Sequence, residues 1–91
     1  MKKEYQVLIG DLLQQYHYKK ENLSHAVGIA DEVRQISLND YAFRLNVGLE
    51  GLLDVAKAAG DSESIKVLDE LVRACAKGNV PTVIYNFYQA G

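Results

Sequence analysis

The chain has 91 residues, of which 48% are hydrophobic and 24% are charged, so it is long enough for one globular domain and too short for two separate cores. Ten basic and twelve acidic side chains give a formal net charge of −2, and they are not separated into blocks. Without a basic arm, electrostatic binding to nucleic acid would require a local patch. We therefore expect a single domain over residues 1–91.

The cysteine content and the N-terminal segment bear on where the protein works. Cys75 is the single cysteine and has no partner for an internal disulfide, which favours a reducing, cytoplasmic setting. The N-terminal lysines precede no long apolar run, so we predict no signal peptide. No stretch approaches the length of a membrane span, and we expect no membrane partner.

Apolar residues recur at helical spacing from about residue 3 to residue 18, which predicts a first helix with one buried face. The face consists of Tyr5, Leu8, Ile9, Leu12, Leu13 and Tyr16.

Residues 19–37 are compatible with two structures. In one, a single helix runs from about residue 21 to residue 36 with Gly28 in its middle. In the other, the chain turns near Gly28 between two short helices, because glycine adopts the positive φ that a tight turn requires.

Residues 37–60 have the strongest helical period in the chain and predict a long central helix, about residues 38–59. Ser37 is a suitable N-cap, and Gly60 can adopt the left-handed closing conformation. Polar residues are expected opposite an apolar face wide enough to contact two neighbours. That face consists of Leu38, Tyr41, Ala42, Leu45, Leu49, Leu52, Leu53, Ala56 and Ala59.

A further helix is predicted from residue 61 or 62 to Lys77, with Asp61 or Ser62 as its cap and Gly78 after its last turn. Its stripe consists of Ile65, Leu68, Leu71, Val72, Cys75 and Ala76. Cys75 is expected to act as a small core residue, because no activating base or cation can be named for it.

The last segment, residues 79–91, is aromatic and uncharged. It is compatible with a short helix that begins near Pro81 and with a strand that would need another molecule's edge; we favour the helix. Aromatic side chains are enriched in interface cores, so the segment is a candidate protein interface, with a lid on the domain's own core as the alternative. The candidate interface residues are Ile84, Tyr85, Phe87 and Tyr88.

A leucine pair at Leu12 and Leu13, Leu23 followed by a small residue, and Gly28 followed by an apolar residue give residues from about 8 to 60 a pattern that resembles the helix-turn-helix unit of the lambda-repressor-like family. Leu12 and Leu13 correspond to the end of its first helix, and Leu23 with Ser24 to its leucine and alanine. Gly28 and Ile29 correspond to its turn glycine and the apolar residue that follows. The stretch LLDVAKAAG resembles the family's fourth helix.

The resemblance implies a DNA-binding regulator, such as one from a phage or mobile element, with Arg34 and Gln35 as candidate DNA contacts. The chain departs from the family after the turn. Val33 and Ile36 lie five and eight residues after Gly28, where the family's apolar residues lie about six and nine. Asp31 and Glu32 would also face the phosphates and repel them, which together with the negative net charge disfavours DNA.

No pattern indicates a catalytic group, a cofactor or a metal site, and His17 and His25 are too far apart on a helix to bind one metal ion together. We predict an all-α fold, a compact bundle of four or five helices around the central helix. We do not expect an enzyme. We expect a small cytoplasmic regulatory or protein-interaction module that binds a protein partner or forms a homodimer. The alternatives are a helix-turn-helix DNA-binding regulator and a helical immunity or antagonist protein.

Overall fold

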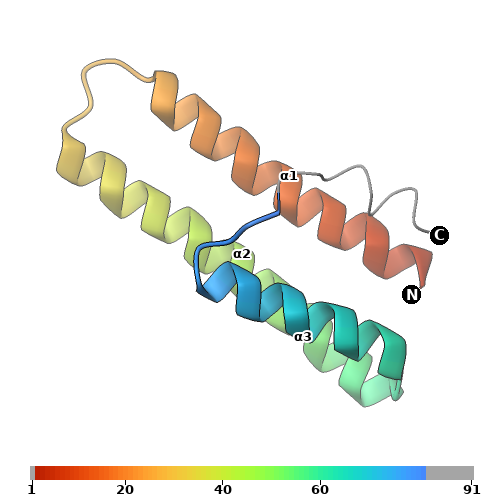
Figure 1. Cartoon of the computed structure of the whole chain (residues 1–91). Coiled ribbons are helices and arrows are strands. Elements are labelled where there is room, and N and C mark those ends of the chain that lie inside the picture. Colours follow the sequence, from red (N-terminus) through yellow and green to blue (C-terminus); the bar gives the residue numbers. More distant parts are fainter. Residues whose placement is uncertain (1, 82–91) are drawn as a thin grey trace.

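The computed structural model describes residues 2–81, which form three helices: α1 (Lys3–His25), α2 (Asp31–Ala59) and α3 (Ser62–Ala76) (Figure 1). The all-α prediction is confirmed. The expected four or five helices are not found within residues 2–81, because segments predicted as separate helices run together. The predicted structure of residues 82–91 lies outside the described residues.

The first helix continues past the predicted end at residue 18 and reaches His25. The sequence KKENL between these points contains no glycine or proline and sustains the helix. The chain then turns at Gly28, whose φ of 78° lies in the left-handed region. The turn near Gly28 was one of the two predicted structures, but the helices it joins are long rather than short.

The central helix begins at Asp31, so the prediction that Ser37 caps it is wrong. Ala30 has an extended backbone, and its carbonyl accepts the first helical hydrogen bond from the Arg34 N–H at 3.0 Å. Asp31 and Glu32 lie in the first turn, where negative charge is favourable. A serine inside a helix costs only a few tenths of a kcal/mol, roughly, so Ser37 does not stop it. The predicted end is confirmed, since Gly60 closes the helix with φ 69°.

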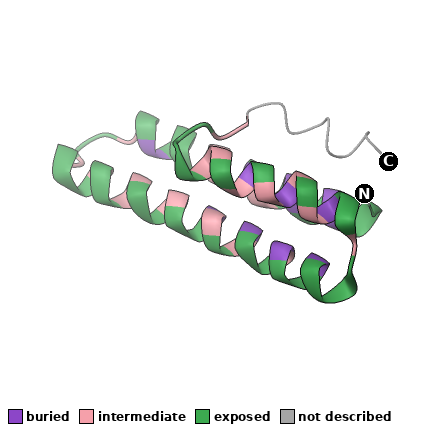
Figure 2. Cartoon of the chain, turned by 60° about the horizontal axis from the view of Figure 1, so that its bottom comes forward, coloured by how far each residue is buried: buried purple, intermediate pink, exposed green. Residues whose placement is uncertain are grey.

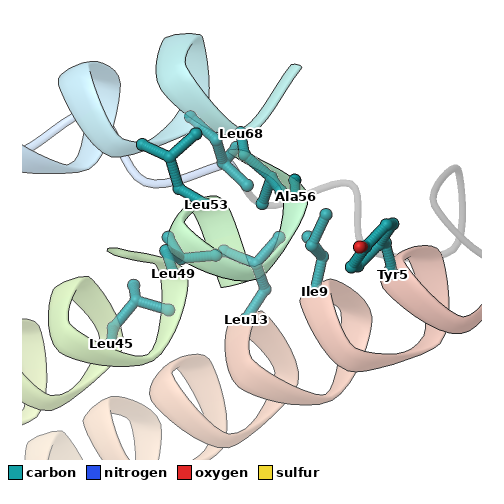
Figure 3. Close-up of a cluster of buried hydrophobic side chains, with 9 residues drawn as sticks. Tyr5, Ile9, Leu13, Leu45, Leu49, Leu53, Ala56 and Leu68 are labelled. Atoms are coloured by element: carbon teal, nitrogen blue, oxygen red, sulfur yellow. The ribbon is translucent and has the colours of Figure 1, made fainter. Parts of the chain in front are cut away.

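The apolar faces of the helices meet in one core, in which α2 packs against both α1 and α3 (Figure 3). Leu13 of α1 and Leu49 of α2 are fully buried, and Leu53 lies beside Leu68 of α3. Three members of the predicted faces are exposed instead, Leu8, Ala59 and Ala76. The core comprises Tyr5, Ile9, Leu13, Leu45, Leu49, Leu53, Ala56, Leu68 and Leu71.

The third helix begins at Ser62 with Asp61 as its N-cap, which confirms one of the two predicted caps. The Asp61 carboxylate accepts a hydrogen bond from the Ser64 N–H at 3.3 Å and another from the Ser64 hydroxyl at 2.7 Å. Ser64 is itself fully buried, so its hydroxyl depends on this partner. The helix ends as predicted at Lys77 and Gly78, with φ 84° at the glycine.

The molecule is elongated, with extents of 47 × 22 × 16 Å, because α2 alone has 29 residues. The shorter α3 lies along the second half of α2 (Figure 1). Residues 14–44, which we call the distal hairpin, extend beyond the core and contain one buried residue, Leu23 (Figure 2). One end of the molecule is therefore packed in three helices and the other in two.

Candidate protein interface

Large apolar side chains are exposed on the side of α2 that faces away from the core. Ile36 is 68% exposed, Phe43 67%, Val33 53% and Val47 50%. At 100° per residue these four positions fall within an arc of about 80°, opposite the buried Leu49. We call this set the outward stripe. Single exposed apolar residues are common, but four on one helix face form a continuous surface of the kind that marks interaction sites.

Carboxylates lie within and beside the outward stripe. Asp40 and Asp54 fall within the same arc, and Glu32 and Glu50 lie along its edge. The Arg44 side chain is paired with Asp40, with Nε and Oδ2 2.8 Å apart. Over the whole of α2, five carboxylates face three basic side chains, so this helix has the same formal charge as the complete chain. The stripe therefore has one acidic edge, which we call the acidic border, while Arg44 on the other edge is paired with Asp40.

Arg34, the first candidate DNA contact, lies at the shared end of α1 and α2. Its guanidinium donates hydrogen bonds to the carbonyl of Leu23 and, at 3.2 Å, to the carbonyl of Ala26. These carbonyls lie at the C-terminal end of α1, where the Leu23 carbonyl also accepts a hydrogen bond from the Ala26 N–H at 3.2 Å. In this position Arg34 joins the two helices and is half-buried.

Gln35, the second candidate DNA contact, is exposed, and its amide donates to the Asn39 side chain at 3.1 Å. The structure does not bring Gln35 together with Arg34 in one contact. The candidate interface residues Ile84, Tyr85, Phe87 and Tyr88 lie outside the described residues.

The end of the described chain is attached to the middle of α1. The His17 Nε2 atom and the Pro81 carbonyl oxygen are 2.6 Å apart, so the imidazole donates to this carbonyl. A surface groove beside this contact is lined by Tyr16, Lys20 and Val80. The contact between His17 and Pro81 thus holds the end of segment 79–81 against α1.

A hollow between α1 and α2 is lined by Leu12, Tyr16, Tyr41 and Leu45, and it holds about 50 Å³. Pockets for small molecules usually have about 300–1,000 Å³, so this hollow is too small to enclose one. Among residues 2–81, no group of three or more His, Cys, Asp or Glu side chains could hold a metal ion. His17 and His25 have separate partners, since His25 lies 4.0 Å from Glu21.

Cys75 is half-buried beside the core, as expected for a small core residue. Burial raises the pKa of its thiol, which disfavours the reactive thiolate. No helix within residues 2–81 is long and apolar enough to cross a membrane.

Comparison of the chain with models of protein families, with curated proteins and with solved structures found no match. The outward stripe is thus the feature on which a function can be argued. Sequence reasoning assigned this side of the helix to polar residues and missed the stripe, although the spacing of Ile36, Phe43 and Val47 by seven and four residues is a helical one.

Proposed function

We propose that this chain is a small cytoplasmic regulatory or protein-interaction module that acts by binding another protein and not by catalysis. The observation that carries the proposal is the outward stripe. A helix that buries one face and leaves four large apolar side chains exposed on the other retains surface that association can bury. An immunity or antagonist protein, which blocks one target by contact, belongs to this class.

The C-terminal residues Ile84, Tyr85, Phe87 and Tyr88 are proposed as a second contact. The support comes from their aromatic, uncharged composition.

DNA binding is not favoured as a second function. Arg34 is engaged by two carbonyl groups of α1, and the start of α2 carries Asp31 and Glu32. Negative side chains at this point oppose the phosphate contacts on which DNA affinity depends.

Photo-crosslinking tests the proposal in cells that express the full chain. The photoreactive residue benzoylphenylalanine replaces Phe43 in one variant and Lys66, an exposed residue of α3, in the control. We expect ultraviolet light to join the first variant covalently to another protein chain and to leave the control largely unjoined. Equal yields from the two positions, or no adduct at Phe43, would contradict the proposed function.

A further inference from the structure

The outward stripe has the length and shape to receive one helix. From Val33 to Val47 it runs about 21 Å, or about four helical turns. A partner helix that lies in such a contact uses apolar side chains at spacings of three, four and seven residues. Gly51, one turn beyond Val47, adds open space, since a Cβ at this position would meet no described atom within 4 Å.

The acidic border limits which helix can bind. Glu50 and Asp54 are exposed, and the Glu50 carboxylate accepts a hydrogen bond from the neutral Asn46 amide at 3.2 Å. Arg44 is paired with Asp40, and Lys57 lies beyond the stripe near the end of α2. Potentials across an interface are usually complementary, so a partner should present positive charge around its apolar face.

We infer that the outward stripe binds an amphipathic helix of a partner protein, with an apolar face flanked by lysine or arginine side chains. This assignment rests on the proposed protein-interaction function and names the chemistry of the partner. Phe43 is the central anchor of the contact, because large aromatic side chains near the middle of an interface contribute most to affinity.

A second copy of the chain fits the stripe less well. Two copies joined through this face would place Asp40 of each copy within the contact and bring their acidic borders close to it. Like charges are then brought together as water is removed, which opposes association. A nucleic acid or an anionic membrane surface would be repelled by the same carboxylates.

A synthetic peptide can stand in for the partner helix. The peptide has roughly 18 residues, about five turns, with leucine on one face and lysine elsewhere. A second peptide keeps the leucines and replaces every lysine by glutamate. Binding to the full-length protein is measured by fluorescence anisotropy of the labelled peptide. We expect saturable binding of the lysine peptide, at least about tenfold tighter than that of the glutamate peptide.

Variants locate the contact on the protein. We expect Phe43→Ser to weaken binding at least about tenfold, and Glu50→Lys to weaken it roughly three- to tenfold. The matched controls are Val7→Ser, an exposed apolar residue of α1, and Glu70→Lys, an exposed carboxylate of α3. Neither control should change the affinity beyond twofold, roughly the effect of a surface charge far from the site. All four sites are exposed, and circular dichroism checks that each variant is folded.

The inference is overturned if the two peptides bind equally, if Phe43→Ser binds like the wild type, or if Glu70→Lys loses as much affinity as Glu50→Lys. Sedimentation of the protein alone tests whether a second copy of the chain occupies the stripe. A dimer that dissociates in the Phe43→Ser variant would show that it does and would overturn the inference. Crosslinked adducts at Phe43 without binding of the lysine peptide would reject the basic helix and leave the proposed function standing.

Discussion

Arg34 connects the beginning of α2 to the end of α1 by side-chain hydrogen bonds. Its guanidinium donates hydrogen bonds to the carbonyls of Leu23 and Ala26, and both bonds are lost when the side chain is removed, while the Ala26 N–H still donates to the Leu23 carbonyl. Carbonyl groups at a helix end are satisfied by capping side chains or by water. We expect Arg34→Ala to lower the free energy of unfolding by about 1 kcal/mol, as measured by urea denaturation.

Two variants serve as controls for Arg34. Gln35→Ala removes an exposed neighbour whose amide contacts the Asn39 side chain, and it should leave the stability nearly unchanged. Arg34→Lys keeps the positive charge but loses the forked donor geometry, so it should restore only part of the loss. If Arg34→Ala is as stable as Gln35→Ala, the side chain does not hold the two helices together.

Asp61 makes the start of α3 sensitive to pH. Its hydrogen bonds from the Ser64 side chain and backbone lower the pKa of the carboxyl group in the folded protein. The unfolded value is near 3.9, so the contribution to stability is fully present above about pH 5 and is lost as the pH falls through the lower folded pKa. We expect the melting temperatures of the wild type and Asp61→Asn to differ most near neutral pH and to converge in acid. A difference that stays constant with pH would contradict this role.

Two glycines of α2 provide a comparison at the level of the helix. A Cβ at Gly51 would meet no described atom within 4 Å, whereas one at Gly48 would lie 2.8 Å from the Leu12 Cδ2 atom. Alanine favours a helix interior over glycine by about 1 kcal/mol. We expect Gly51→Ala to gain most of that free energy and Gly48→Ala to gain less, because Leu12 must move. Urea denaturation of both variants measures the difference, and equal gains would argue against close packing at Gly48.

The buried faces of the helices and the ends of α3 could be predicted from the sequence, whereas the end of α1 and the start of α2 could not. Buried residues such as Leu45, Leu49 and Leu68 follow the helical period, which depends only on local spacing. The start of α2 depends on contacts distant in sequence. Arg34 reaches back to α1, and Ser37 is compatible with both a cap and a helix interior. Gly60 could be predicted as a helix end, whereas for Gly28 the sequence left a turn and a helix interior open, and the structure shows a turn with positive φ.

The candidate interface was harder to predict from the sequence than the helices were. Phe43 and Val47 lie among the polar residues Arg44, Asn46 and Glu50 in the sequence. Because of these neighbours, this side of α2 was predicted to be an ordinary polar, solvent-exposed face. Arg34 had a residue type suited to base contacts, but residue type alone does not show that its guanidinium bonds the end of α1. The exposure of Phe43 and the hydrogen-bond partners of Arg34 are set by the fold, so the structure was needed to identify the stripe and the role of Arg34.

At the scale of the whole molecule, α2 has two roles. Its inner face supplies four core residues to the packing of α1 and α3. Its outward stripe begins in the distal hairpin and continues to Val47, alongside the core. The same helix therefore holds the fold together and presents the proposed interface, and a partner can bind the outer side without opening the core.

The most direct measurement is the yield of photo-crosslinking with benzoylphenylalanine placed in turn along α2. Positions 36, 43 and 47 lie on the outward stripe, while Asn39 of α2 and Lys66 of α3 are exposed positions outside it. A contact through this face predicts yields that follow the helical period, high at the three stripe positions and low at the other two. Yields that are uniform along the helix, or highest at Lys66, would contradict the assignment of the outward stripe as the protein-binding surface.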